Sequence, residues 1–357
     1  MATLPEQTIT QRIYAAWERR AGDGFRPHLG ASIIGDDCER AAWLSFRWAT
    51  LENKGGRMLR LLDRGQREEA VIVADLKRIG VDVREVDATG NQYRVEAHNG
   101  HFGGSMDGVG HRLPEMGRDW FLLEFKTSND KNFKKLVKDG VRKAKPEHYA
   151  QMQVYMKLGG LTKALYVVVN KNDDTLYTEV VELDEAHADY QISKARDVIV
   201  AMEPPPRLHL DPTWYRCKHL CKHHGVCHSV AVPVPTCRSC TWGSPMLDGH
   251  HQGWQCMRNS HSPVLLDLQQ QKHGCEQHLY AKGIITWAEN IGITQSGGVT
   301  YKRNDNGGVF VNGTEKGAWS SIELYKGCGA AGVPEIEQLK EGVGVRVLNY
   351  EEVSDPA

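Results

Sequence analysis

The sequence has no long apolar run: nowhere do 18 apolar residues follow one another, which excludes an ordinary membrane-spanning helix. No basic leader followed by an apolar stretch and a small-residue cleavage site opens the chain, so we expect a cytoplasmic protein with no membrane partner. The Walker A pattern G-x-x-x-x-G-K-[ST] is also absent, so we expect no ATP-driven motor of that type on this chain.

An excess of charge of one sign is missing too. The 44 Lys and Arg residues balance 45 Asp and Glu residues, for a formal net charge of -1. This balance excludes a globally basic nucleic-acid coat, and contact with phosphates therefore needs a local patch. Residues 126–145 supply one, and a solvated helical face is the alternative explanation. The candidate DNA-binding residues are Lys131, Lys134, Lys135, Arg142, Lys143 and Lys145.

Cysteine, by contrast, is plentiful, with nine residues in a chain of 357. A disulfide framework is not expected in a reducing compartment or in a chain that can bury a large core. Metal binding is therefore the leading explanation, and seven of the nine cysteines lie between Cys217 and Cys275. Cys38 and Cys328 stand apart, and Cys328 is interpreted as a packed small hydrophobe.

The hydrophobic pattern predicts helices and strands in the order of an α/β sandwich. A helix is expected over 61–80, short strands over 81–87, 91–97 and 101–110, a buried strand over 120–127, a helix over 147–160 and a strand over 164–171. This order predicts a mixed central sheet flanked by helices. We expect three domains: a core over 1–205, a Cys/His-rich metal-binding region over 206–280, and a small α+β region over 281–357. The last region contains an expected hairpin at 301–313 and a helix that starts at a Ser320–Glu323 capping box.

Two carboxylates and a lysine fall where the predicted strands would bring them together. Glu124 and Lys126 are two residues apart on a strand, so they share one face while Phe125 points into the other layer. Asp107 lies beside a turn of the preceding hairpin, and antiparallel pairing would place it next to Glu124. Converging carboxylates suit Mg²⁺ or Mn²⁺. A surface ion pair is the alternative for Glu124 and Lys126.

The order of these motifs resembles the RecB-like branch of the PD-(D/E)XK nuclease superfamily over residues 25–230. Its iron-sulfur members, the AddB-type nuclease domains and the CRISPR-associated exonucleases, are the most similar. The resemblance implies a restriction-endonuclease-like core and a metal-dependent DNA exonuclease in recombination, repair or phage DNA metabolism, in the host cytoplasm if phage-encoded. By resemblance, Asp107 is the motif aspartate, Glu124 and Lys126 form the E-x-K element, and the Phe125 carbonyl is an additional ligand.

Two helical motifs of the family have counterparts here. After Gly65, the first motif is met by Glu69, which we favour as metal ligand, or by Glu68, because only one of two neighbours on a helix can face the metal. The Q-x-x-x-Y motif is met by Gln151 and Tyr155, which share a helix face at i and i+4. The resemblance implies that Gln151 binds phosphate or water and that Tyr155 contacts the DNA backbone.

One cysteine set resembles the iron-sulfur staple of those nucleases. It combines Cys38 with the group Cys217, Cys221 and Cys227, and implies a structural 4Fe-4S cluster. Three residues rather than the usual two separate Cys217 from Cys221. Zinc is therefore an alternative, and the histidines that could substitute as ligands are His219, His223, His224 and His228.

A second set predicts a structural zinc site. Cys237 and Cys240 form a C-x-x-C knuckle, and Cys256 and Cys275 complete four ligands. His278 could replace Cys275, and reduced thiols are the alternative explanation. Three tryptophans near these sets are expected to pack beside a metal site rather than to stack on bases, namely Trp214, Trp242 and Trp254.

Two other functions remain open at this point. A zinc and iron-sulfur DNA-binding module could retain the nuclease fold without catalysis, and a sequence-specific endonuclease could use the same core. The expected partners are single-stranded or duplex DNA ends, and recombination or replication proteins. The sequence leaves the polarity of digestion, the strand preference and the oligomeric state open.

Overall fold

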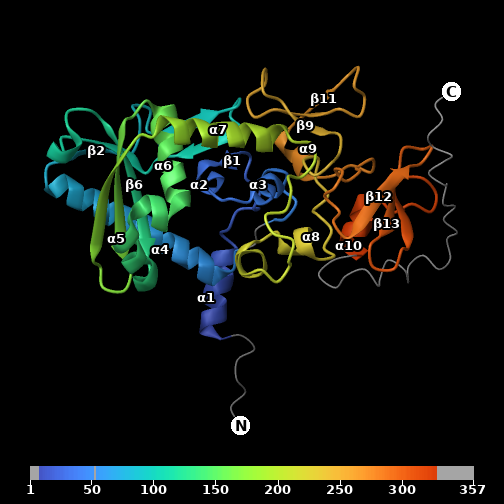
Figure 1. Cartoon of the computed structure of the whole chain (residues 1–357), viewed down its shortest axis with the longest axis horizontal. Coiled ribbons are helices and arrows are strands. Elements are labelled where there is room, and N and C mark those ends of the chain that lie inside the picture. The colour runs from blue at the N-terminus through green and yellow to red at the C-terminus, as the bar shows by residue number, and fades with distance from the viewer. Residues whose placement is uncertain (1–7, 52–53, 328–357) are drawn as a thin grey trace, which may run out of the picture. The chain divides into compact units, whose positions relative to one another are not determined.

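The computed structural model describes residues 8–51 and 54–327 (Figure 1). Cys328 and the rest of 328–357, which belong to the expected C-terminal region, lie outside the described residues. The chain forms two compact units, with unit 1 comprising 1–24, 30–36 and 52–195, and unit 2 comprising 25–29, 37–51 and 196–357. The division into 1–205, 206–280 and 281–357 is different and stays a prediction. Among the described helices, none is long and apolar enough to cross a membrane.

Unit 1 is built on a five-stranded sheet in the order β2-β5-β6-β7-β8. Its strands are β2 (Asp82–Arg84), β5 (Gly108–His111), β6 (Phe121–Ser128), β7 (Lys163–Asn170) and β8 (Leu176–Glu182). Only β6 and β7 are parallel in this sheet, and the other neighbours are antiparallel. The predicted α/β class with a mixed central sheet is therefore confirmed.

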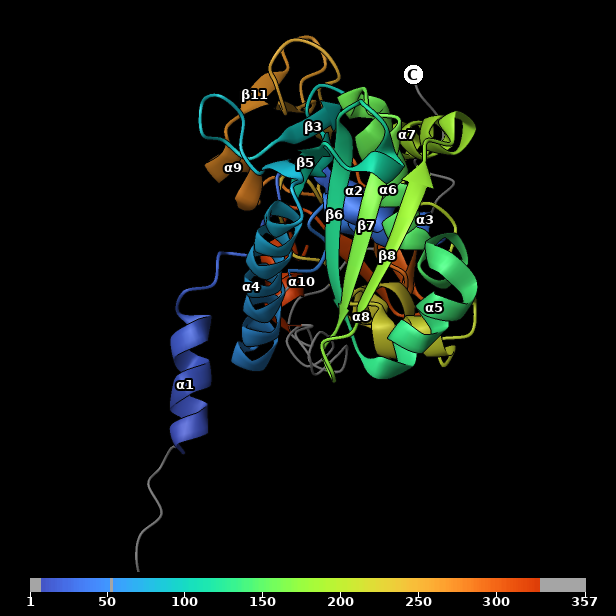
Figure 2. The same cartoon turned by 90° about the vertical axis from the view of Figure 1, so that its left-hand side faces the viewer.

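Helices cover both faces of this sheet. Alternate residues of β6, namely Phe121, Leu123 and Phe125, pack with Ile72 and Leu76 of α4 (Gly56–Arg78) in one apolar core. The other face carries α5 (Asp130–Ala144) and α6 (Pro146–Gly159), and Figure 2 shows β6, β7 and β8 side by side with α4 and α5 on opposite sides. Because side chains alternate along a strand, residues 122, 124 and 126 point toward the α5 and α6 layer.

The remaining elements of unit 1 are shorter or lie at its ends. They are α1 (Ile9–Glu18), α2 (Ala31–Ile34), β3 (Arg94–Ala97), β4 (Phe102–Ser105), the 3₁₀ turn η1 (Pro114–Met116) and α7 (Glu185–Val200), which continues into unit 2; β1 (Leu29–Gly30) spans a boundary between the units. The helices and the other strands expected between residues 61 and 171 are present, but the single strand expected over 101–110 is divided at Met106 and Asp107 into β4 and β5, which belong to different sheets. Neither β8 nor α7 was expected from the sequence.

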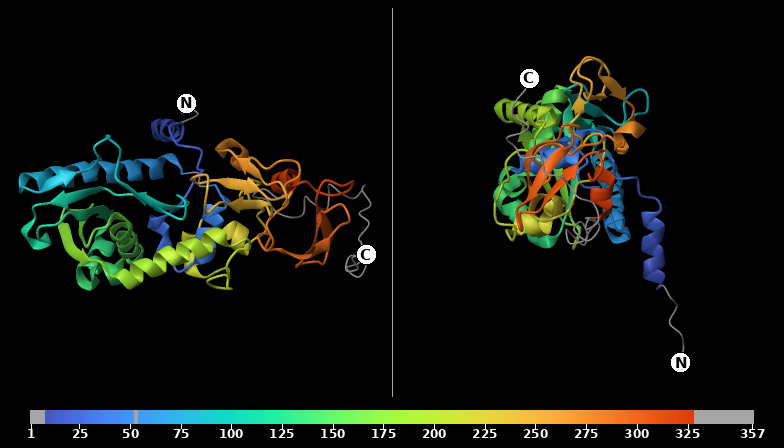
Figure 3. Two further views of the ribbon diagram at one scale, coloured as in Figure 1. Left: turned by 90° about the horizontal axis from the view of Figure 1, so that it is seen from above. Right: turned by 90° about the vertical axis from the view of Figure 1, so that its right-hand side faces the viewer.

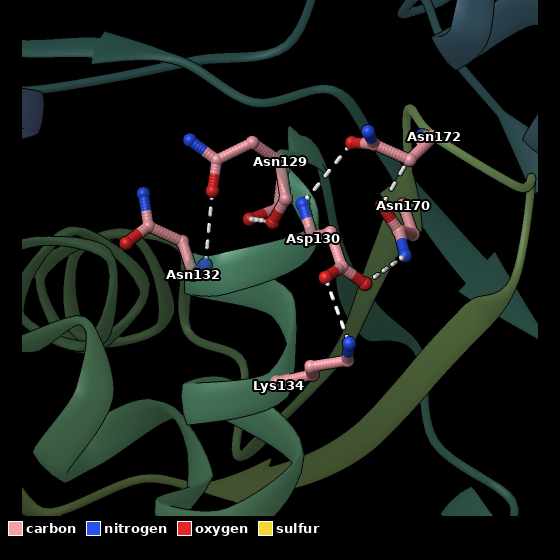
Figure 4. A network of polar contacts seen from close by, with 7 residues as sticks. Asn129, Asp130, Asn132, Lys134, Asn170 and Asn172 are labelled. Carbon is pink, nitrogen blue, oxygen red and sulfur yellow. Dashed lines mark hydrogen bonds and ion pairs between the residues drawn. The ribbon is translucent and has the colours of Figure 1, made fainter.

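A polar network fixes the start of α5 to the end of β7 (Figure 4). The Asp130 N–H donates to Asn172 Oδ1 at 3.1 Å, and the Asn170 side-chain amide donates to Asp130 Oδ1 at 3.4 Å. Asn129 caps the helix by accepting from the Asn132 N–H at 2.9 Å. The first turn of α5 is thereby tied to the strand that lies next to β6.

Unit 2 contains two small antiparallel sheets and several short helices. One sheet consists of β9 (Gly243–Pro245), β10 (Trp254–Cys256) and β11 (Val264–Leu266). The other consists of β12 (Ala288–Ile293), β13 (Val299–Arg303) and β14 (Val309–Asn312), and it has the deeper orange of the two in Figure 3. The helices are α3 (Glu39–Phe46), the π-helix η2 (Arg216–Leu220), α8 (His224–His228), α9 (Leu268–Lys272) and α10 (Ser321–Gly327). The predicted hairpin is β13–β14, and the Ser320–Glu323 capping box is formed, with the Glu323 N–H donating to Ser320 Oγ at 3.2 Å.

A buried arginine organises the core of unit 2. Arg238 lies inside the C-x-x-C knuckle, is 1% exposed, and has its guanidinium 3.7 Å from the ring centre of Trp48 and 4.7 Å from that of Trp254. It donates to Gln271 Oε1 at 2.8 Å and to the Pro27 carbonyl at 2.9 Å. Burying a cation is costly unless its donors are satisfied, so these contacts fix the path of the knuckle.

Candidate active site

The Asp107 carboxylate accepts a hydrogen bond from the main chain of β6. Antiparallel pairing of β5 with β6 sets Gly108 opposite Leu123, which places the residue before Gly108 beside the middle of β6. There the Phe125 N–H donates to Asp107 Oδ2 at 2.8 Å. The antiparallel pairing expected from the sequence is confirmed, and Phe125 points its ring into the α4 core as predicted.

Glu124 and Lys126 form an ion pair on the opposite face of β6. The Lys126 ammonium donates to Glu124 Oε1. The Glu124 side chain is fully buried, whereas that of Lys126 is 27% exposed and marks the open side of the site. Glu124 Oε2 is buried and has no hydrogen-bond partner among the described residues. A buried carboxylate oxygen without a donor is costly, so this atom identifies a place where a further positive group is needed.

The carboxylates shift one another's ionisation. Burial raises the pKa of Glu124 to about 7, against the opposing effect of the Lys126 ammonium, and the Asp107 carboxylate raises it further. Burial also raises the pKa of Asp107, while Lys126 and the Phe125 N–H oppose that rise. For Lys126, the carboxylates of Glu124 and Asp107 outweigh burial and raise the pKa, so its side chain remains an ammonium. The site therefore holds more buried negative charge than Lys126 alone compensates.

Of the two glutamates considered for the first motif, Glu69 is the one whose ionisation is influenced by Asp107 and Lys126. Its pKa is raised by burial and then by the Asp107 carboxylate, with Lys126 acting in the opposite direction. The Glu68 carboxylate lies 3.9 Å from Arg64 one turn earlier on α4, in a partly exposed ion pair. The helix thus turns neighbouring carboxylates in different directions, and Glu69 is the one within electrostatic range of Asp107.

The Q-x-x-x-Y motif occupies one face of α6, as its spacing predicts. Gln151 and Tyr155 are both buried. Burial raises the pKa of Tyr155, and the Glu124 carboxylate adds to that rise. A Cβ at Gly104 on β4 would lie 2.3 Å from the Tyr155 hydroxyl, so the absence of a side chain at Gly104 leaves room for this tyrosine.

Two polar residues next to this site, His148 and Tyr166, were not expected from the sequence. His148 Nδ1 lies 2.6 Å from the Tyr166 hydroxyl, and Tyr166 on β7 is in register with Glu124 on β6. His148 precedes Gln151 by three residues, so helical spacing could have placed it on the same face. Tyr166 lies within an apolar strand, and nothing in that run separates it from a core residue.

The candidate DNA-binding residues lie on α5 or at its end. Lys134 is ion-paired with Asp130 at 2.8 Å (Figure 4), and Arg142 with Asp184 at 3.2 Å. No ion pair within the described residues involves Lys131, Lys135, Lys143 or Lys145. The exposed members of this second group can therefore turn toward a phosphate without breaking an ion pair.

The first cysteine set lies within unit 2. Cys38 precedes α3, Cys217 lies in η2, Cys221 follows it, and Cys227 lies in α8, and none of the four is in a disulfide. Burial raises the pKa of Cys221, and the other three thiols raise it further. The structure thus brings all four within electrostatic range of one another. One of the alternative ligands, His223, bonds through Nε2 to Ser45 Oγ at 2.8 Å.

The second set is also gathered in unit 2. Burial raises the pKa of Cys237 to about 12, with further contributions from Cys240, Cys275 and Cys256. The alternative ligand His278 already uses Nε2 to contact the Thr236 carbonyl at 2.9 Å. Trp254, one of the three tryptophans expected to pack, is fully buried against Phe46.

The donor atoms of the acidic site and of the two cysteine sets suit metals. Asp107 and Glu124 offer hard carboxylate oxygens, one of them buried without a partner, and each cysteine set offers four thiols. As the side chains stand in residues 8–51 and 54–327, however, no three His, Cys, Asp or Glu residues form a group that could hold a metal ion. Metal binding at any of these places is therefore a proposal.

No family model matches the sequence. No curated protein matches it either. Among solved structures, an alkaline exonuclease (LHK-Exo) from Laribacter hongkongensis is similar, with a TM-score of 0.36, 19% identity, and coverage of 52% of this chain and 90% of that chain. The same exonuclease in complex with dAMP has a TM-score of 0.36 and 20% identity, and the match covers 52% of this chain and 89% of that chain. The crystal structure of SSO0001 has a TM-score of 0.37 and 17% identity, and the match covers 63% of this chain and 98% of that chain. Similarity at this level does not establish a function, which has to be argued from the site.

Proposed function

We propose that this protein is a Mg²⁺- or Mn²⁺-dependent deoxyribonuclease that hydrolyses phosphodiesters at DNA ends, in recombination, repair or phage DNA metabolism. The observation that supports it most strongly is the convergence of Asp107, Glu124 and Lys126 across two paired strands. A purely structural ion pair would not require the second buried carboxylate or the unpartnered Glu124 oxygen. A divalent ion held by Asp107, Glu124, Glu69 and the Phe125 carbonyl would lower the pKa of a water and stabilise charge on the phosphate.

The residues of the chain perform distinct tasks in this proposal. Lys126, which stays an ammonium and is partly exposed, orients the attacking water and binds the phosphate oxygens. The buried carboxylates of Asp107 and Glu124 keep the orientation of Lys126 fixed. Gln151 and Tyr155 supply neutral hydrogen-bond donors from α6, and neutral donors can contact phosphate without adding to the crowding of charge.

The test uses the full-length protein with Mn²⁺ and end-labelled single-stranded, duplex and circular DNA. Progressive release from ends, lost in Asp107→Ala and Lys126→Ala, supports the proposal. Cleavage that persists in those variants contradicts the assigned site. DNA binding without metal-dependent cleavage indicates a non-catalytic binding module, and defined fragments from circular DNA indicate an endonuclease.

We further propose that the first cysteine set binds a 4Fe-4S cluster and the second set a zinc ion. Both sets combine cysteines distant in the chain, so each metal would close long loops of unit 2 and stabilise it. Anaerobic purification with metal analysis and a visible spectrum tests both assignments. Cys38→Ser should remove iron and colour while zinc is retained, and Cys240→Ser should do the opposite. Cys328→Ser, which alters neither set, is the matched control, and a colourless wild-type protein with zinc alone overturns the cluster.

A further inference from the structure

His148 lies next to the candidate active site without being part of the motifs described above. It occupies the first turn of α6, and its Nδ1 is 2.6 Å from the hydroxyl of Tyr166. Tyr166 is 1% exposed and lies opposite Glu124 in the parallel register of β6 and β7. Residues opposite each other in a sheet point to the same face, so this hydrogen bond continues the polar row that begins at Lys126 and Glu124.

The hydrogen bond orients the imidazole. Burial raises the pKa of Tyr166, with a further contribution from Glu124, so its hydroxyl keeps its proton. That buried proton needs an acceptor, and no other hydrogen bond of this hydroxyl is found in the described residues. Nδ1 of His148 is thus the acceptor, and a neutral imidazole that accepts at Nδ1 carries its proton on Nε2.

The surroundings of His148 are positive. Burial and the ammonium groups of Lys126 and Lys145 lower the pKa of His148 to about 3, so the ring is neutral at physiological pH. The side chain is partly exposed, and within the described residues Nε2 makes no hydrogen bond. His148 thus presents a neutral N–H donor in the helical turn that begins at Lys145, on the same face of the sheet as Lys126, and such a donor near ammonium groups suits an anion.

We propose that His148, Lys126 and Lys145 form a phosphodiester subsite that binds the phosphate next to the one being cleaved. The ligand class is a nucleic-acid strand, and the inference rests on the proposed nuclease function. Lys126 would contact both phosphates, His148 would donate from Nε2 to a non-bridging oxygen, and Lys145 would neutralise its charge. Tyr166 acts as a positioning residue, because its hydroxyl orients the His148 ring and does not contact the nucleic acid.

The experiment measures kcat and KM for end-labelled single strands that carry one uncharged methylphosphonate at successive positions. In the wild-type protein, one position adjacent to the cleaved bond should raise KM about tenfold, the size expected for a charge-assisted hydrogen bond. His148→Ala should raise KM severalfold on the normal substrate and show a smaller effect of that methylphosphonate, because only the contributions of Lys126 and Lys145 remain. His148→Gln, which keeps a donor, should recover most of the loss, and Tyr166→Phe should show part of it.

His111→Ala is the matched control, because His111 is a partly exposed histidine of the same unit that contacts the Arg118 carbonyl and stacks on Trp120. It should behave as wild type. If His148→Ala cleaves DNA with an unchanged KM and an unchanged methylphosphonate profile, the subsite is wrong while the nuclease assignment stands. If the wild-type protein does not cleave DNA with any divalent metal, the proposed function itself fails. Should His148→Ala unfold, a flat methylphosphonate profile in the wild-type protein overturns the subsite.

Discussion

The Phe125 N–H donates to Asp107 Oδ2 at 2.8 Å, so one hydrogen bond links the two strands that supply the acidic residues of the site. The same bond leaves Asp107 Oδ1 available for another partner. It also fixes Asp107 relative to Glu124, the residue before Phe125. The geometry of the acidic pair is therefore set by the main chain of β6.

Asp107→Asn should separate the structural role of this residue from its charge. The amide oxygen can still accept the hydrogen bond from Phe125, so the free energy of unfolding should change little. Asp107→Ala leaves that N–H without its acceptor and should cost about 1–3 kcal/mol. Both variants should lose at least ~100-fold in the rate of DNA cleavage, because the carboxylate is absent. Urea unfolding and single-turnover cleavage measure the two effects, and an active Asp107→Asn protein would show that the charge is dispensable.

Glu69→Gln and Glu68→Gln form a matched pair on adjacent positions of α4. Glu69 lies within electrostatic range of Asp107, whereas Glu68 is paired with Arg64 at 3.9 Å. We expect Glu69→Gln to lower cleavage at least ~10-fold and to raise the Mn²⁺ concentration needed for half-maximal activity. Glu68→Gln should retain activity and alter the free energy of unfolding by no more than ~0.5 kcal/mol. The opposite pattern would identify Glu68 as the ligand.

Two glycines should respond to alanine in opposite directions. At Gly104 a Cβ would lie 2.3 Å from the Tyr155 hydroxyl, whereas at Gly65 nothing lies within 4 Å. Gly104→Ala should therefore displace Tyr155, cost about 1–3 kcal/mol and reduce cleavage. Gly65→Ala, in the interior of α4, should stabilise by ~0.5–1 kcal/mol and leave cleavage unchanged. Equal activities in the two variants would mean that Tyr155 has no role at the site.

Much of this arrangement could be predicted from the sequence because local patterns control it. The alternation of side chains along β6 fixes the shared face of Glu124 and Lys126. The capping box at Ser320 and the hairpin before it are equally local. In each case the residues that decide the structure lie within a few positions of one another.

The remaining features depend on contacts between segments distant in the chain. Tyr166 and His148 come together only because β7 lies parallel to β6 beneath α6, a topology that no short pattern specifies. The choice of Glu69 over Glu68 depends on the rotation of α4 against the sheet. The edge strand β8 was not expected because only one of its 7 residues is buried, so its sequence lacks the apolar alternation of a half-buried strand.

The basic residues of α5 predict a graded dependence of DNA binding on salt. Binding of a fluorescent single strand in EDTA should follow a line of log Kd against log salt concentration. Lys135→Ala should reduce its slope by ~0.7, the value for one lost phosphate contact. Lys134→Ala should change it less, because Asp130 already compensates that ammonium at 2.8 Å. Equal slopes for the wild type and a Lys131/Lys135/Lys143 triple alanine variant would exclude this face of α5 from the DNA path.

His278 should make the protein sensitive to acid. Burial lowers its pKa from 6.5 to about 4 in the folded protein, and its Nε2 contacts the Thr236 carbonyl at 2.9 Å. The unfolded chain therefore binds more protons than the folded protein between pH 6.5 and 4, and stability falls as the pH falls through that window. The loss attributable to this residue should reach at most about 3 kcal/mol.

Chemical unfolding between pH 7 and 4 measures this effect as the difference between the wild-type protein and His278→Gln, which removes the titrating ring. The wild-type protein should lose the advantage it has over the variant as the solution is acidified, since only in the wild type does unfolding expose this imidazole and let it bind a proton. His251→Gln, at an exposed histidine of the same unit, is the control and should follow the wild-type curve. A difference between wild type and His278→Gln that stays constant over this range would show that His278 is not held neutral by burial.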